Sequence, residues 1–119
     1  MDNEKVFAMS VGKVYPLLVA KAERKGRMKA EVDQVTCWLT GYTPQQLESQ
    51  VAAGVTYRDF FAQAPQMSPY CNLITGSIRG IKVQEIEDPL MQKIRWLDKL
   101  VDELAKGKPM EKILRSPKA

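Results

Sequence analysis

The sequence predicts one mainly α-helical domain, a small bundle of about five helices that cross at large angles, with a short extended or hairpin segment near residues 73–83. The length of 119 residues allows one hydrophobic core but not two. Apolar residues recur at helical spacing through much of the chain, and capping residues, prolines and glycines stand where such helices would begin or end. We expect an ordered core over residues 5–114 of the single domain 1–119, and a frayed tail at 115–119.

Two helices are predicted in the N-terminal third of the chain. The first follows Ser10 and stops near Gly26, and Pro16 must lie near its first turn or kink it. Its apolar positions are Val11, Val14, Tyr15, Leu18, Val19 and Ala22. The second is expected from about residue 29 to residue 39, with Gly41 after it. Its apolar stripe consists of Met28, Val32, Val35 and Leu39.

Two shorter helices are predicted next, each opened by a threonine cap. In Thr43-Pro44-Gln45-Gln46, threonine is the N-cap, proline takes the first helical position and the second glutamine completes a capping box. Thr56 opens the other helix, which Pro65 bounds. Between Pro65 and Asp88, prolines, glycines and β-branched residues indicate either a small hairpin or an ordered loop, and both alternatives stay open.

The last large helix has the fullest set of sequence signals, because Asp88 is a suitable N-cap, Pro89 fits the first helical position and Gly107 ends it. Its apolar stripe consists of Leu90, Ile94, Leu97, Val101 and Leu104. Trp96 lies off this stripe, with Leu100 beside it. These two side chains either widen the core, which we favour, or form an exposed interface for a partner helix or a second copy of the chain.

The sequence contains no histidine, which removes His-activated nucleophiles and His-dependent zinc sites. Cys37 and Cys71 form no Cys-x-x-Cys pair, so we expect small buried apolar residues rather than a disulfide framework or a zinc site. The interpretation therefore leans against an enzyme and predicts no metal and no cofactor. No apolar run reaches the roughly 20 residues that span a bilayer. The N-terminal residues lack a signal-peptide pattern, so we expect a cytoplasmic location without membrane contact.

The net charge of +4 is unevenly distributed. Residues 1–29 carry seven basic and three acidic side chains, residues 30–105 carry six and ten, and residues 106–119 carry five and one, which gives +4, −4 and +4. The densest basic cluster consists of Lys21, Arg24, Lys25, Arg27 and Lys29. It falls at the junction of the first two predicted helices, as in a helix-turn-helix hinge. Glu31 and Asp33 would repel phosphates there, so we favour a solvated helix end and keep nucleic-acid binding as the less favoured alternative.

The loop of residues 65–85 is a second candidate site. Tyr70, Cys71 and Asn72 lie in a polar stretch rich in glycine and proline, which is typical of segments that line a pocket. Arg79 would lower the pKa of the Cys71 thiol if the two were close. Without histidine this thiol lacks its usual base, so the prediction is a pocket rather than a catalytic centre.

Several blocks of the sequence are similar to a known family. They read VYPLLVAKAERKGR (14–27), WLTGY (38–42), LITG (73–76), IEDPLM (86–91), LDKL (97–100) and ELAKGK (103–108). Over roughly residues 5–114 they resemble the small bacterial proteins catalogued as domain of unknown function 2200. The resemblance implies a bacterial cytoplasmic protein with a mainly helical fold, and it implies no catalytic residue. Cys37 and the stretch 67–72 depart from the family pattern, which argues against a shared catalytic thiol.

Three functional hypotheses follow from the sequence. The favoured one is a non-enzymatic binding or protein-interaction module, with a homo-oligomer or another protein as its partner. The alternatives are nucleic-acid binding through residues 21–29 and a small-molecule site or weak enzyme in the loop 65–85. The residues do not identify a substrate or a specific partner.

Overall fold

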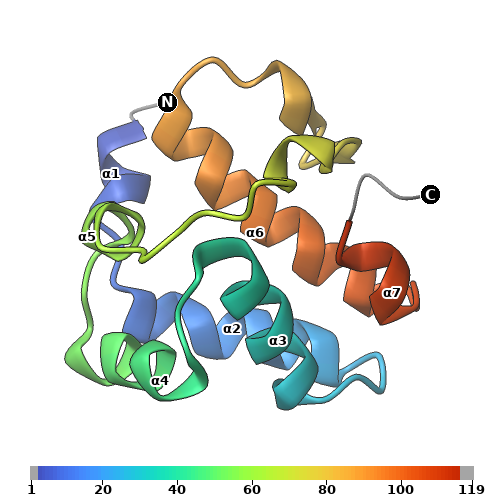
Figure 1. The fold of residues 1–119 in the computed structure, drawn as a ribbon, viewed down its shortest axis with the longest axis horizontal. Helices are drawn as coiled ribbons and strands as arrows, with labels where there is room; N and C mark the ends of the chain where they lie inside the picture. The colour runs from blue at the N-terminus through green and yellow to red at the C-terminus, as the bar shows by residue number, and fades with distance from the viewer. Residues whose placement is uncertain (1–2, 116–119) are drawn as a thin grey trace.

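The computed structural model describes residues 3–115 and is mainly α-helical, as predicted (Figure 1). Its α-helices are α1 (Asn3–Phe7), α2 (Val11–Glu23), α3 (Lys29–Thr40), α4 (Pro44–Ala53), α5 (Tyr57–Ala62), α6 (Pro89–Ala105) and α7 (Met110–Ile113). The strands are β1 (Ser77–Ile78) and β2 (Ile81–Lys82), flanked by the 3₁₀ turns η1 (Cys71–Leu73) and η2 (Val83–Glu85). The sequence did not predict α1. In the described part of the chain, no helix is long and apolar enough to cross a membrane.

The long helix α6 lies at the centre of the core (Figure 1). Helices α2 and α3 pack against it, and α5, α7, β1 and η2 contact it as well. The predicted apolar stripe faces these neighbours: Ile94, Leu97, Val101 and Leu104 are buried, and Leu90 is half-buried against the core. The α6 stripe is therefore the main contact surface around which the other elements are arranged.

Trp96 and Leu100 also lie in the core. Trp96 is only 5% exposed and Leu100 is fully buried. The exposed interface that was one alternative for these two side chains is therefore wrong, and the favoured alternative, a wider core, is the one observed. The physical reason is that α6 is covered on several sides, so its apolar surface must extend beyond a single stripe.

Local capping determines where the later helices begin. The hydroxyl of Thr43 accepts a hydrogen bond from the Gln46 backbone N–H at 3.1 Å, and the Gln46 side chain accepts one from the Thr43 N–H at 3.0 Å. This is the predicted capping box. At the start of α6, the carboxylate of Asp88 accepts a hydrogen bond from the Met91 N–H at 2.9 Å. These caps satisfy backbone donors that have no partner within the helix.

The segment that the sequence left open contains a hairpin. Ile78 pairs with Ile81 in an antiparallel register, and the two residues between them form the turn. Arg79 and Gly80 have φ angles of 54° and 78°, so both are left-handed, as in the type I′ turns that suit the twist of a hairpin. Because Ile78 and Val83 are buried and β1 and η2 contact α6, the hairpin is fixed to the core.

The end of the described chain is tied back to α6. The guanidinium of Arg115 donates two hydrogen bonds of 2.6 Å to the carboxylate of Glu103, which is only 4% exposed. Arg115 is the first residue of the predicted tail, and its contact with Glu103 fits the rule that a buried carboxylate requires a charged partner. The rest of the predicted tail, 116–119, lies outside the described residues.

Candidate ligand-binding groove

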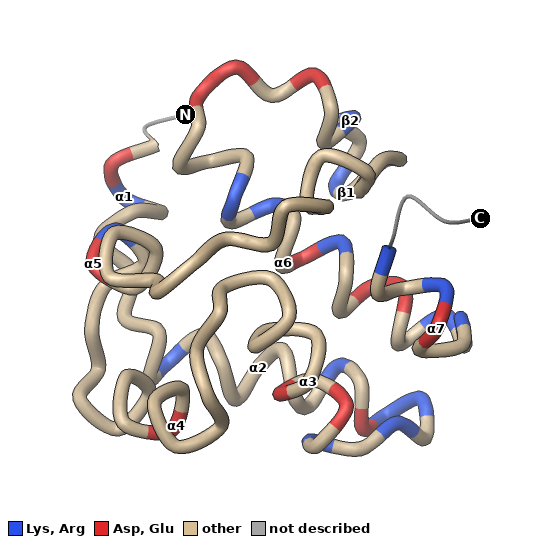
Figure 2. Tube along the Cα trace, in the orientation of Figure 1, with Lys and Arg blue, Asp and Glu red and all other residues tan. Residues whose placement is uncertain are grey.

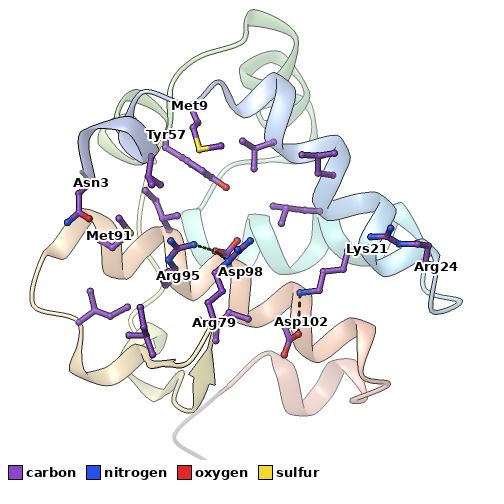
Figure 3. A pocket seen from close by; sticks show the side chains of 18 residues that line it. Asn3, Met9, Lys21, Arg24, Tyr57, Arg79, Met91, Arg95, Asp98 and Asp102 are labelled. Atoms are coloured by element: carbon purple, nitrogen blue, oxygen red, sulfur yellow. Dashed lines mark hydrogen bonds and ion pairs between the residues drawn. The ribbon is translucent and has the colours of Figure 1, made fainter. Parts of the chain in front are cut away.

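A groove of about 1210 Å³ opens between α1 and α2 on one side and α6 and the hairpin on the other (Figure 3). Most of its lining is apolar: Val6, Met9, Val14, Leu17, Leu18, Ile78, Ile81, Ile86, Met91 and Ile94. The polar lining consists of Asn3, Lys21, Arg24, Tyr57, Arg79, Arg95, Asp98 and Asp102. An apolar cavity with a few convergent polar groups is typical of ligand sites.

The apolar wall is built mainly by α2 and the hairpin. Helix α2 has a second apolar stripe beside the one that faces the core, and its most exposed member is Leu17, at 67%. Met9, before α2, is 46% exposed, and Ile81, on β2, is 48% exposed. Three of the most exposed large apolar side chains in residues 3–115 therefore line one groove, where a monomer would normally place polar residues.

A cluster of polar side chains lies on the groove floor, where α5, α6 and the hairpin meet (Figure 3). The carboxylate of Asp98 accepts a hydrogen bond from the Arg95 guanidinium at 2.7 Å. The Nε of Arg79 lies 3.9 Å from the same carboxylate, and this side chain remains 69% exposed. Asp98 itself is 8% exposed, so its charge is buried but paired.

Tyr57 is the least exposed polar residue of this cluster. It is 3% exposed, and its hydroxyl points toward the middle of the groove (Figure 3). No atom of residues 3–115 forms a hydrogen bond with that hydroxyl. Burial raises the pKa of Tyr57, and the charge of Asp98 raises it further, against the opposing effect of Arg95 and Arg79. The hydroxyl is therefore protonated at neutral pH and free to donate.

A second charged group closes the other end of the groove. The carboxylate of Asp102 lies 3.2 Å from the Lys21 ammonium and 3.0 Å from that of Lys106. Burial would raise the pKa of Asp102, but these two ammonium groups outweigh burial and hold it below its usual value. Lys21 lies on α2, and Asp102 and Lys106 lie at the end of α6. These ion pairs form a clamp that joins the two helices, and its three charged groups are already paired with one another.

The basic cluster lies at the junction of α2 and α3 (Figure 2). Several of its side chains are paired within the same chain. The guanidinium of Arg27 is bonded to Glu31 and to the backbone carbonyls of residues 104 and 108. Lys29 pairs with Asp33 at 2.9 Å, and Lys21 belongs to the clamp with Asp102. Arg24 and Lys25 are the members of the predicted cluster that are exposed and unpaired within the described residues. Three of the five cations are therefore paired, each with a different carboxylate, and two are available among the described residues.

The residues predicted to form a pocket around residue 71 do not all lie at one site. Arg79 lines the groove, whereas Tyr70, Cys71 and Asn72 are not among its lining residues. Cys71 is half-buried, and burial raises the pKa of its thiol, opposite to the lowering expected from Arg79. Trp96 and Leu100 are in the core and do not line the groove. Within residues 3–115, no group of three or more acidic, cysteine or histidine side chains is placed to hold a metal ion.

Sequence reasoning missed most of the groove residues. The sequence predicted Tyr57 only as part of the short helix that follows Thr56, and it singled out neither Arg95 nor Asp98 within the long helix. One local signal was available: Arg79-Gly80 separates two β-branched residues, Ile78 and Ile81, as in a two-residue hairpin turn. The exposed Leu17 gave no signal of its own, because its neighbours in the sequence are also apolar.

Comparison with known proteins places the chain in a family. A model of the family described as "Uncharacterized protein conserved in bacteria (DUF2200)" matches residues 5–115. The crystal structure of the uncharacterized protein SP1917 is similar, with 50% sequence identity, a TM-score of 0.89, and coverage of 96% of this chain and 93% of that chain. No curated protein matches the chain. Because the family model spans nearly the whole sequence, the resemblance is confirmed, and the chain belongs to the DUF2200 family of proteins conserved in bacteria.

Proposed function

We propose that the protein is a non-enzymatic binding module and that its groove binds a largely apolar ligand. The observation that carries this proposal is that exposed apolar side chains and the unpaired hydroxyl of Tyr57, a largely buried residue, line the same groove. Leu17 and Ile81 remain in contact with water there, and Tyr57 on the floor has no hydrogen-bond partner among the described residues. A bound ligand would cover the apolar side chains and accept a hydrogen bond from the hydroxyl.

Two effects would stabilise a bound ligand: burial of apolar surface and a hydrogen bond from Tyr57. Apolar surface removed from water contributes about 25 cal/mol per Å². A ligand that covers the apolar side chains of α2 and β2 would therefore be stabilised by burial alone, without polar contacts. The hydroxyl of Tyr57 supplies one directional contact, and ligand sites normally combine an apolar surface with a few such polar groups. A protein partner or a second copy of the chain would use the same apolar wall.

The proposal is tested with the neutral dye N-phenylnaphthylamine, whose fluorescence rises in apolar surroundings. We expect wild-type protein to enhance its fluorescence, and Leu17→Gln to weaken the binding about fivefold, because roughly 1 kcal/mol of apolar contact is lost. Leu73→Gln is the matched control, since Leu73 is also exposed but lies outside the groove. Equal binding by wild type and Leu17→Gln, or no binding by wild type, would contradict the proposal.

The basic junction supports a nucleic-acid site less well. Three of its five cations are paired with carboxylates of the same chain. Only Arg24 and Lys25 remain available among the described members of that cluster, and phosphate binding usually depends on several free cations. The groove therefore carries the functional proposal.

A further inference from the structure

We infer that the groove selects an amphipathic organic anion, a slender apolar molecule with one carboxylate-type head group. The head would lie between Arg79 and Tyr57, and the apolar body would lie along Leu17 and Ile81. This inference rests on the proposed function and names its ligand class. It is carried by a tyrosine hydroxyl that faces the groove without a partner among the described residues, by a cation in an unusual backbone conformation, and by the balance of charge in the groove.

The first step concerns Tyr57. Its hydroxyl is protonated at neutral pH and points into the groove, and it has no acceptor within residues 3–115. The hydroxyl oxygen is not among the side-chain atoms of residues 3–115 that are fully buried without a hydrogen-bond partner, so it is accessible from the groove and a ligand can reach it. A negatively charged oxygen is the strongest acceptor for this donor. A ligand with an anionic oxygen at one end would therefore complete the floor of the groove.

The second step concerns Arg79. Its φ of 54° is left-handed, a conformation that most side chains disfavour and that asparagine or glycine adopts more readily. A hairpin turn selected for stability alone would place asparagine before Gly80. The arginine instead presents an exposed guanidinium over the groove, with one long contact of 3.9 Å to Asp98. Most of its five N–H donors are left for a planar acceptor such as a carboxylate.

The third step is the balance of charge. The groove is lined by four cations, Lys21, Arg24, Arg79 and Arg95, and by two anions, Asp98 and Asp102, so its net charge is +2. Asp98 is already paired with Arg95 at 2.7 Å, and Asp102 is paired with two lysines. Of the two cations whose charge acts on Tyr57, Arg95 and Arg79, the one without a close partner is therefore Arg79. Complementarity favours an anion and opposes a cation with the same apolar body.

The depth of the hydroxyl favours a small molecule over a protein partner. Tyr57 is only 3% exposed, so an acceptor must reach the floor of the groove to meet it. A terminal carboxylate on a narrow chain can do this while its body remains on the apolar wall. The volume of about 1210 Å³ accommodates such a molecule, because ligand cavities commonly measure about 300–1,000 Å³.

The test compares three probes with the same apolar chain: octanoate, octanol and octyltrimethylammonium. Their dissociation constants are measured by two-dimensional NMR titration of the full chain, with the shifts mapped onto the groove. We expect octanoate to bind about tenfold more tightly than octanol, and octyltrimethylammonium more weakly than both. A smaller probe set could not separate the contribution of the head group from that of the chain.

Two variants locate the head group. Tyr57→Phe keeps the ring and removes the hydroxyl, and Arg79→Asn removes the charge while keeping a residue that accepts the left-handed turn. Each should lower octanoate affinity by about threefold to tenfold and leave octanol affinity unchanged. Tyr70→Phe and Lys82→Asn are the controls, because both positions are exposed outside the groove, and Lys82 lies in the same hairpin. Thermal unfolding should show Arg79→Asn to be at least as stable as wild type.

The outcomes separate this inference from the proposed function. Equal affinity for octanoate and octanol at the groove would overturn the anion class and leave the apolar groove in place. Failure of octanol to shift groove amides would overturn the groove itself. Octanoate shifts confined to Lys25 and Lys106, which lie outside the groove, would mean surface anion binding and would overturn the inference. A dimer in sedimentation that dissociates in Leu17→Gln would identify a second copy as the occupant and overturn it as well.

Discussion

At the scale of single residues, two glycines with the same backbone conformation have different surroundings. Gly26 and Gly41 end the turns after α2 and α3 with φ angles of 84° and 83°. A Cβ on Gly26 would meet no atom within 4 Å, whereas a Cβ on Gly41 would lie 2.6 Å from the carbonyl oxygen of Gln66. The first glycine is required for its conformation, and the second is required for its conformation and for the close passage of another segment.

This difference predicts unequal costs for the same substitution. Gly26→Ala should lower the free energy of unfolding by about 1–2 kcal/mol, from left-handed strain alone. Gly41→Ala should cost about 1–3 kcal/mol more, because the backbone of residue 66 must move or the new methyl group must be accommodated by strain. Urea denaturation of the two variants measures both values. Equal losses would show that the contact with Gln66 is not rigid.

At the scale of elements, the clamp between α2 and α6 makes stability depend on pH. The pKa of Asp102 is held below its usual value by Lys106 and Lys21, so the folded state favours the ionised carboxylate more than the unfolded state does. The stabilisation is therefore present above the unfolded pKa, about pH 4, and it is lost as pH falls through the lower folded pKa. Both lysines remain partly exposed, which limits the effect to about 1 kcal/mol or less.

We expect Asp102→Asn to flatten this part of the stability curve. The free energy of unfolding of wild type should fall more steeply between neutral pH and about pH 3 than that of the variant. Chemical denaturation at a series of pH values measures the two slopes. Glu48→Gln is the control, because Glu48 is an exposed acid of α4, and it should keep the wild-type slope. A variant with the wild-type slope would show that the clamp contributes nothing to acid sensitivity.

At the scale of the whole molecule, the sequence predicted what depends on near neighbours in the chain. The caps at Thr43 and Asp88 and the apolar stripe of α6 were correctly predicted, because each involves residues within one helix. The groove was not predicted, because it combines α2, α5, α6 and the hairpin, which meet only after folding. Burial of Trp96 was likewise undecided by sequence, since it depends on how many elements surround α6.

The central position of α6 gives the last prediction. Leu97 is 1% exposed and lies on α6, the helix that contacts most of the other elements. Leu97→Ala should therefore leave a cavity that few neighbouring side chains can refill. The expected loss is roughly 2–5 kcal/mol in the free energy of unfolding. Leu73→Ala removes the same atoms from a side chain that is 43% exposed and should cost less than about 1 kcal/mol. Denaturation curves for both variants test the difference. If the two losses were similar, α6 would not be the centre on which the core depends, and the groove that its Arg95 and Asp98 help to form would lack a rigid floor.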